Sequence, residues 1–556
     1  MSSRACSNDM IRGERMKSAI SILLSICLVT GLFYPVPIYA VSVQTEIEFF
    51  ADCLKTLGLF EGTDKGYELD RNSTRVESAV MLTRLLGKEE EALSLRLTHP
   101  FTDVPVWANP YIGYLYQKRL TKGIGNNLFG SDQLTTPVQY AAFILRSLGY
   151  TEEKGDFTYF QALEKILELG VLERSEAEDI DKDKLLTRGE MVQFSYKALW
   201  CHAKQSDDRL VDRLINYGAV SELCVNALGK PKFPSDISVF NNRYIVKTQV
   251  QLDELIKWAL FSRMDHLLIN PLGYTGDIHQ DANDSLKKND SFAGMYNGAD
   301  FKWLTDTKGS MIQYEITIRY TMSSFEKQEL LRHACRVIAS EIQSGMTDME
   351  KELVIHDYVV NRTVYGYSEH AYDAYGALIQ KESVCQGYSR AMLLLLSLSG
   401  VYCMEVVGTD EDTSHSWNIV RLDDEYYHVD ASFDDPIGVK NVLRHYYFNV
   451  TDKDLESYRV WERSNYPVCA SEKYNYYNIT GTTVKDRVEL LERIAMGFSE
   501  GKRTFEYRLT NYDKEDYTPE GMREFIHELS SKIKGNILSY SWVPYDKMGV
   551  VHITLK

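Results

Sequence analysis

Glu382-Ser-Val-Cys-Gln-Gly-Tyr-Ser389 is the stretch that decides the fold of the central part of this chain. The apolar run that follows, from Gly387 to Leu398, ends before Gly400 and predicts a buried helix terminated by glycine. Cys385 would then lie at or just before the N-terminus of this helix. There the helix dipole favours a thiolate, and free backbone amides can face an oxyanion. The stretch therefore predicts a nucleophilic cysteine.

A histidine and an aspartate follow the cysteine in two downstream segments, Ser414-His-Ser-Trp-Asn418 and Tyr427-His-Val-Asp-Ala-Ser-Phe-Asp-Asp-Pro436. A thiol is a good nucleophile as the thiolate, and an imidazole with a carboxylate behind it favours that form. We therefore predict that Cys385, His415 and Asp430 form a triad for covalent catalysis. Taken alone, a cysteine before a leucine run is more often a buried structural thiol. It is the three residues together that favour catalysis.

The spacing of these segments also predicts where the histidine and the aspartate lie. His415 to Leu422 and Glu425 to Phe433 are predicted to be two strands joined by a turn at Asp423-Asp424. With a turn of two residues, Trp417 lies opposite Asp430, so the histidine and the aspartate share one face as diagonal neighbours. Such neighbours are roughly 7–8 Å apart. A shift of one residue in the register would place them on opposite faces.

These segments resemble the transglutaminase-like superfamily, in particular its bacterial members. The resemblance extends from Met346 to Trp461 and rests on Val384-Cys-Gln-Gly-Tyr388, His415-Ser-Trp-Asn418, Tyr427-His-Val-Asp430, Phe433-Asp-Asp-Pro436, Ile355-His-Asp-Tyr358, Tyr365 and Tyr447-Phe-Asn-Val450. It implies a papain-like α+β core, in which a helix with the cysteine packs on an antiparallel sheet with the histidine and the aspartate.

The same resemblance implies chemistry at a carboxamide or peptide carbonyl through a thioester, with His415 as base and Asp430 as the residue that orients it. The substrate would be a protein or a peptide. Water and an amine both remain open as the acceptor. The backbone amide of Cys385 is the expected first oxyanion donor. The second donor stays open, because Gln386 is too close to the nucleophile for that role.

A weak internal repeat precedes this region and extends to about Gln205. Each copy has a helix, a leucine-glycine turn, a polar loop and a second helix, a pattern typical of repeat architectures. A threonine followed three residues later by glutamate is a capping box, so part of the pattern has a structural reason. The copies contain Leu57-Gly-Leu-Phe-Glu-Gly62 with Thr74-Arg-Val-Glu77, Phe101-Thr-Asp-Val104 with Thr135-Thr-Pro-Val-Gln139, and Leu169-Gly-Val-Leu172 with Thr187-Arg-Gly-Glu190.

These copies resemble S-layer homology repeats, which occur in threes and bind secondary cell-wall polymers of Gram-positive bacteria. The arginine that contacts the polymer in that family corresponds to Arg75 and Arg188. The second copy has Pro137 in its place, and the first and third copies lack the full Phe-x-Asp-Val opening. The resemblance implies wall anchoring. The alternative is a degenerate helical module that only supports the enzyme domain.

The N-terminus is typical of a secretion signal. Basic residues at 12, 15 and 17 precede an apolar run from Ala19 to Tyr34, and Ile38-Tyr-Ala40 is a candidate cleavage site. An uncleaved membrane anchor is the alternative, although the run is short of the roughly 20 residues of a spanning helix. Export leaves seven cysteines with no regular spacing, which does not indicate a disulfide framework.

Composition narrows the function classes further. A chain of 556 residues predicts several domains, and a net charge of −17 argues against non-specific binding to nucleic acid or anionic membrane. The sequence has no glycine-rich nucleotide loop and no paired-cysteine metal site, so we expect neither a cofactor nor a metal. The polar segment from Gly273 to Asn297 is expected to be an exposed loop. Its acidic residues indicate a solvated turn in preference to a cation site.

Two segments separated by 238 positions share a pattern: Val246-Lys-Thr-Gln-Val-Gln-Leu252 and Val484-Lys-Asp-Arg-Val-Glu-Leu490. Each precedes a helical stretch and then a strand, at Leu267-Leu-Ile269 and Phe505-Glu-Tyr507. This indicates two related α/β modules on either side of the catalytic core, unless a simple β-α-β pattern recurs here by chance. Similar units flank transglutaminase-like domains in secreted proteins, which implies an adaptor or substrate-guiding role.

The predicted fold class is therefore a multidomain chain with all-α S-layer homology-like repeats, an α+β papain-like core and flanking α/β modules. The predicted ranges are a signal peptide at 1–40, repeats at 41–205, an α/β module at 206–325, the catalytic domain at 326–470 and a second α/β module at 471–556. The predicted function is a secreted, cell-wall-associated cysteine peptidase, amidase or acyltransferase of a Gram-positive bacterium, without a membrane span after signal cleavage. The alternative is a wall-bound scaffold that keeps the fold without catalysis.

Overall fold

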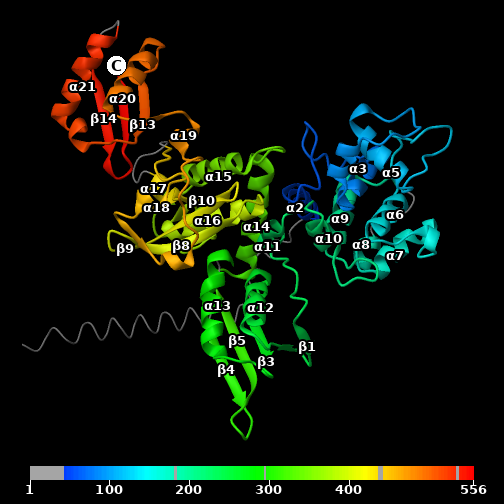
Figure 1. Cartoon of the computed structure of the whole chain (residues 1–556). Helices are drawn as coiled ribbons and strands as arrows, with labels where there is room; N and C mark the ends of the chain where they lie inside the picture. The colour runs from blue at the N-terminus through cyan, green and yellow to red at the C-terminus, as the bar shows by residue number, and fades with distance from the viewer. Residues whose placement is uncertain (1–42, 179, 181–183, 294–295, 436–442, 534–536) are drawn as a thin grey trace, which may run out of the picture. The chain divides into compact units, whose positions relative to one another are not determined.

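The structure is a computed structural model that describes residues 43–178, 180, 184–293, 296–435, 443–533 and 537–556 (Figure 1). The predicted signal peptide lies outside the described residues. The chain divides into one unit at 1–46 and a second at 47–556. The first unit contributes only the start of the first helix, α2 (Val43–Thr56), to the described part. Within the described residues, no helix is long and apolar enough to span a membrane.

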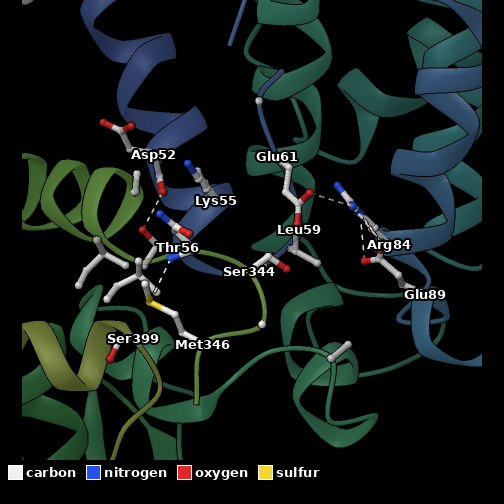
Figure 2. A pocket seen from close by; sticks show the side chains of 18 of the residues that line it. Asp52, Lys55, Thr56, Leu59, Glu61, Arg84, Glu89, Ser344, Met346 and Ser399 are labelled. Atoms are coloured by element: carbon white, nitrogen blue, oxygen red, sulfur yellow. Dashed lines mark hydrogen bonds and ion pairs between the residues drawn. The ribbon is translucent and has the colours of Figure 1, made fainter. Parts of the chain in front are cut away.

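Helices make up the regular structure of the N-terminal repeats. Their order is α2, α3 (Arg75–Leu85), α4 (Glu89–Leu95), α5 (Asn109–Gln117), α6 (Pro137–Ser147), α7 (Ala162–Glu168), α8 (Arg174–Glu178) and α9 (Arg188–Leu199), with α10 (Leu210–Asn216) and α11 (Glu222–Ala227) after them. Short 3-10 turns at Val106–Ala108, Glu152–Lys154 and Tyr159–Gln161 connect them. In residues 47–178 and 184–205 no strand is assigned, and only isolated bridges occur. An ion pair connects two neighbouring helices: Arg84 of α3 lies 2.9 Å from Glu89 at the start of α4 (Figure 2).

Three of these helices start in the same way. Each has a threonine N-cap and a capping-box partner three residues on, in the pairs Thr74 with Glu77, Thr136 with Gln139, and Thr187 with Glu190. The residues just before the caps form a ring. Ser73 N–H donates to the Leu186 carbonyl at 2.8 Å, Leu186 N–H to Thr135 at 2.8 Å, and Thr135 N–H to Ser73 at 3.0 Å. The three copies thus meet with approximate threefold symmetry.

The first α/β module contains β1 (Ser238–Phe240), β2 (Arg243–Ile245), α12 (Gln249–Ser262), β3 (His266–Asn270), α13 (Ile278–Ala293), β4 (Tyr296–Thr305) and β5 (Met311–Tyr320). Its sheet has the order β1-β2-β3-β5-β4, and α12 and α13 pack side by side (Figure 1). Helix α13 corrects the prediction of a loop over 273–297. Asp277 caps its first turn, and the buried Ile278, Ala282 and Leu286 recur every four residues.

The second α/β module repeats this topology. It contains β12 (Thr483–Val484), α20 (Arg487–Ser499), β13 (Thr504–Leu509), α21 (Pro519–Lys532), β14 (Tyr540–Tyr545) and β15 (Val550–Leu555). The order β12-β13-β15-β14 matches β2-β3-β5-β4, with a parallel first pair and antiparallel later pairs in both sheets.

The agreement extends to single hydrogen bonds in the two modules. Lys247 N–H donates to Gln251 at 2.9 Å, and Lys485 N–H donates to Glu489 at 2.8 Å. Each donor precedes its helix by the same two residues, because α12 starts at Gln249 and α20 at Arg487. The two modules therefore share both strand order and a capping hydrogen bond at the offset of 238 positions, which supports the predicted relation.

The α+β core comes between these two modules in the sequence. Its elements are α14 (Ser324–Glu341), α15 (Asp348–Arg362), β6 (Val364–Tyr365), a π-helical turn (Gly376–Gln380), β7 (Glu382–Ser383), α16 (Cys385–Leu398), β8 (Cys403–Asp410), β9 (Thr413–Leu422), β10 (Glu425–Val429), α17 (Ala431–Asp434), α18 (Asp452–Leu455), β11 (Arg459–Trp461) and α19 (Tyr476–Ile479). The antiparallel sheet has the order β10-β9-β8-β11, and the buried α16 packs on β8 and β9.

The β9–β10 hairpin has the predicted register. Leu422 pairs with Glu425 and Asn418 with Val429. Asp423 and Asp424 both have positive φ, 48° and 63°, which is the backbone of the tight two-residue turn that matches strand twist. The second strand is shorter than predicted. It ends at Val429 because the carboxylate of Asp430 caps the short helix α17, so the prediction of a strand to Phe433 is wrong.

Candidate active site

Cys385 is the first residue of α16, as its sequence context predicts. Val384 precedes it and its side chain caps none of the first amides of the helix, although the Gly387 amide donates to the Val384 carbonyl at 3.0 Å. Gly387 lets this helix start approach its surroundings, because a Cβ there would lie 1.8 Å from Ser383 Oγ. Cys385 is partly exposed, whereas most of the other free cysteines in the described residues are buried. The thiol is accessible at a helix N-terminus.

His415 lies on β9 and bonds to Asp430 across the hairpin. Its Nε2 is 2.6 Å from Asp430 Oδ2, which leaves Nδ1 for the hydrogen bond to Cys385. The imidazole stacks on Trp417 with 5.7 Å between ring centroids, and Phe433 meets it edge-on at 4.6 Å. The structure therefore brings the three predicted residues together, and two aromatic rings hold the imidazole in its plane.

All the acceptor capacity of Asp430 is used. Its Oδ1 accepts the Ser432 and Phe433 amides at 3.1 Å each and the Ser432 hydroxyl at 2.7 Å. Its Oδ2 accepts from His415 and also lies 2.7 Å from Arg459 Nη2. The carboxylate is 2% exposed, so these partners replace the water that a buried charge would otherwise lack. Asp430 is consequently fixed in both position and charge.

Arg459 is the site residue that sequence reasoning missed. It comes from β11 and is buried, with Nε 2.9 Å from Asp410 Oδ2. Its guanidinium carbon lies 4.7–4.9 Å from the ring centroids of Trp417, Phe433 and Tyr447, within the range of a cation–π contact. Only its place between aromatic residues, Tyr458 and Trp461, could have singled it out in the sequence.

These contacts set the protonation of the pair. Burial alone would lower the pKa of His415, but Asp430 and the hydrogen bonds to Asp430 and Cys385 raise it to about 9. Burial would raise the pKa of Asp430, yet the charges of His415 and Arg459 hold it well below its ordinary value. At neutral pH the two side chains are therefore an imidazolium and a carboxylate, and the imidazolium can stabilise a thiolate on Cys385.

Tyr365 lies beside Cys385. Strand β6 pairs in parallel with β7, which places Tyr365 next to Ser383, two residues before Cys385. Its hydroxyl interacts with both the backbone amide and the thiol of Cys385, and burial together with that thiol raises its pKa. Its ring stacks with Tyr388 at 6.4 Å. The tyrosine thus supplies a donor next to the amide expected to bind an oxyanion.

Part of the core matches a known protein family. Residues 336–431 match the profile of the Transglutaminase-like superfamily. This part of the chain is a transglutaminase-like domain. It holds Cys385, His415 and Asp430, while Arg459 lies outside the matched range. A solved structure of a TGase is similar at 15% identity and a TM-score of 0.19, over 32% of this chain and 53% of that one.

Three relatives each match a quarter of the chain or less. An endoglucanase of Bacillus sp. (strain KSM-635) is 28% identical over 155 residues, a cell surface protein of Thermoanaerobacter kivui 30% over 112, and a middle cell wall protein of Brevibacillus brevis 27% over 114. The matches cover 25%, 20% and 20% of this chain. They cover 16%, 14% and 11% of the relatives, so this chain spans a small part of each.

The two arginines predicted to contact a wall polymer make contacts within the repeats. Arg188 is 4% exposed, pairs with Glu77 at 2.8 Å and lies over the Phe60 ring at 5.1 Å. Arg75 donates to the carbonyl of Phe129 at 3.0 Å and lies over the same residue's ring. Both guanidiniums therefore stack on a phenylalanine, and the charge of Arg188 is already paired.

The protonation of His415 gives the first testable expectation. Because folding raises its pKa from 6.5 to about 9, its contribution to stability is complete below pH 6.5 and is lost as the pH rises through about 9. Histidine NMR of the folded protein should show a resonance that titrates near pH 9. Asp430→Asn should move that midpoint toward 6.5, and Asp452→Asn, at the carboxylate beside His428, should not. A wild-type midpoint near 6.5 contradicts the assignment.

Proposed function

We propose that this protein is an extracytoplasmic, cell-wall-associated cysteine enzyme that acts on a carboxamide or peptide bond through a Cys385 thioester. The observation that carries the proposal is the continuous series Cys385, His415, Asp430 and Arg459, in which a partly exposed thiol faces an imidazolium that a buried carboxylate holds. A chain with the same fold but no catalysis would have no reason to keep a charged pair beside an accessible thiol.

The proposed first half-reaction uses these groups in turn. The Cys385 thiolate attacks the carbonyl carbon, and the electron pair of the C=O bond moves to oxygen. The Cys385 amide and the Tyr365 hydroxyl are the donors proposed to face that oxyanion. As the tetrahedral intermediate collapses, the imidazolium of His415 gives its proton to the leaving nitrogen. The amine departs and the acyl group stays on sulfur as a thioester.

The second half-reaction regenerates the enzyme. Neutral His415 takes a proton from water or from an amine, which attacks the thioester carbonyl. Cys385 leaves as the thiolate, so the imidazolium–thiolate pair is restored and the product is an acid or a new amide. Nothing in the triad selects between these acceptors. The proposal therefore covers a peptidase, an amidase and an acyltransferase.

Wall association is proposed from the repeats. Two of the relatives are described as a cell surface protein and a middle cell wall protein, and the chain has three helical repeats around an approximate threefold axis. We infer that the repeats are S-layer homology-like, that the chain is exported, and that they hold the enzyme at a secondary wall polymer. A supporting role for the catalytic domain alone is the alternative.

The catalytic assignment predicts the reactivity of single thiols. Iodoacetamide should modify Cys385 faster than any other cysteine near neutral pH, because it is the partly exposed thiol beside an imidazolium. Cys201, which is also partly exposed but whose pKa is raised by burial, is the internal comparison. Mass spectrometry after short labelling measures both rates. Equal labelling of Cys385 and Cys201 favours a non-catalytic scaffold.

Substitutions test turnover itself. A mass-spectrometric screen of glutamine-containing peptides and wall fragments, with and without an amine, identifies the substrate and the acceptor. Cys385→Ala should abolish turnover with the fold intact. Asp430→Asn should lower the rate by on the order of 10²- to 10⁴-fold, because the imidazole loses its charge partner and its orientation. Wild-type rates in either variant would refute the triad.

Tyr365→Phe tests the proposed oxyanion donor. A p-nitrophenyl ester acylates cysteine through an oxyanion, whereas iodoacetamide alkylates it without one. We expect acylation to fall on the order of 10²-fold or more, while alkylation stays near the wild-type rate. Tyr388→Phe, at the ring that stacks on Tyr365, is the matched control and should keep both rates. If acylation is unchanged in Tyr365→Phe, another group binds the oxyanion.

Anchoring is tested with the whole chain and purified secondary wall polymer. The full-length protein should sediment with the polymer, and a chain that lacks residues 41–205 should not. Cys385→Ala should sediment like the wild type, since the thiol has no part in anchoring. Loss of sedimentation on deletion supports anchoring, and equal sedimentation of both chains, or of neither, rejects it.

A further inference from the structure

A second cluster of titratable side chains lies apart from the triad. His356 and Asp357 are in α15, and His445 comes from the segment after α17. His356 Nδ1 is 3.1 Å and His445 Nε2 is 2.8 Å from the same oxygen, Asp357 Oδ1. One ligand atom from each residue lies within 4.8 Å of the others. Two imidazoles and one carboxylate at such distances are the donor set of a divalent transition-metal site.

Neighbouring residues fix the imidazole rings of His356 and His445 in the way that metal-binding histidines are usually fixed. His356 is fully buried, and its second nitrogen, Nε2, is 3.1 Å from Asp434 Oδ2. A carboxylate on the second nitrogen of a ligating histidine fixes the tautomer and leaves the first nitrogen's lone pair for the ion. His445 stacks on Tyr476 with 3.8 Å between centroids and 5° between planes. Both rings are therefore held in place by residues outside this cluster.

A comparison within the core shows why this cluster differs from a similar one. A second group also has one ligand atom from each residue within 4.8 Å of the others: His428, Asp452 and Cys469. There, however, the Trp417 indole N–H donates to His428 Nδ1 at 2.9 Å, while Nε2 is 2.8 Å from Asp452. Since a neutral imidazole has one lone pair, and the indole already uses it, His428 has none left for a metal. In contrast, both nitrogens of His356 face carboxylate oxygens.

We propose that His356 Nδ1, Asp357 and His445 Nε2 bind one divalent transition-metal ion, with Zn²⁺ as the ion to test. The charge supports this, because a dication balances the carboxylates of Asp357 and Asp434 once the two imidazoles are neutral. Asp357 is about one-third exposed at its side chain, 33%, and gives solvent a route to the fourth coordination position. No redox change is involved, and bound protons are released as the ion enters.

The site would act as a clamp within the core. It joins α15 to the segment that contains His445, and through His356 it braces Asp434, the last residue of α17. The sequence did not predict it because Asp357 and His445 are 88 positions apart and no motif links them. The inference does not depend on the proposed catalysis, since none of its ligands belongs to the triad.

The test uses the full-length chain with Cys385→Ala, because a free catalytic thiol next to His415 would itself bind zinc. After removal of metals with a chelator, titration calorimetry with Zn²⁺ alone should show one site. His445→Gln and Asp357→Asn should each weaken binding at least tenfold. Cys469→Ala, in the cluster whose histidine lacks a free lone pair, should bind as the parent does. Co²⁺ in place of zinc should give the visible absorption of a four-coordinate ion.

Each outcome decides the proposal. It is overturned if the parent takes up no zinc, if both ligand variants bind like the parent, or if Cys469→Ala removes binding. Circular dichroism without metal checks that the variants fold. Should His445→Gln fail to fold, Asp357→Asn decides, because that residue is partly exposed and its replacement keeps the side-chain volume. A zinc-dependent rise of the unfolding temperature in the parent that is lost in Asp357→Asn supports the clamp.

Discussion

The carboxylate of Asp430 is the constraint on which the centre of this protein depends. It caps α17, binds the His415 imidazole and pairs with Arg459, which comes from the far edge strand of the sheet. His415 and Arg459 are both buried, so removal of either leaves an uncompensated charge, at a cost of roughly 3–5 kcal/mol. The group that orients His415 therefore also holds β10, α17 and β11 together. The geometry of the proposed triad and the stability of the fold therefore depend on the same interaction.

Helix α17 shows how the contacts of Asp430 also fix a neighbouring element. It has only four residues, Ala431–Asp434, too few to be stable alone. The aspartates at its start and end each bond to a histidine, Asp430 to His415 on β9 and Asp434 to His356 on α15. Asp434 also accepts the Tyr447 amide at 3.0 Å. The short helix is thus fixed between the sheet and a long helix, which leaves Asp430 little freedom to move away from the imidazole.

The sequence predicted what local patterns encode. The glycine-terminated helix of Cys385, the register of the β9–β10 hairpin and the relation between the two α/β modules follow from periodicity, turn length and a fixed offset. Arg459 could not be found this way, because its partners are brought to it by strand order. Helix α13 was mistaken for a loop since its many polar residues obscured the spacing of Ile278, Ala282 and Leu286. Local sequence patterns were sufficient to predict most helices and strands. They were not sufficient to predict charge pairs between residues that are far apart in the sequence.

In the repeats, too, contacts that stabilise the fold can be distinguished from groups that could bind a polymer. Their capping boxes and their ring of backbone bonds account for the Thr-Arg-x-Glu pattern by folding alone. Arg188 is buried against Glu77 and Phe60, and a polymer would have to displace that ion pair to reach it. Displacement leaves Glu77 with Arg71, at 2.7 Å, and with its capping-box partner Thr74. If the repeats hold a wall polymer, the more exposed Arg75 or other surface groups must therefore supply most of the binding, and Arg188 chiefly the fold.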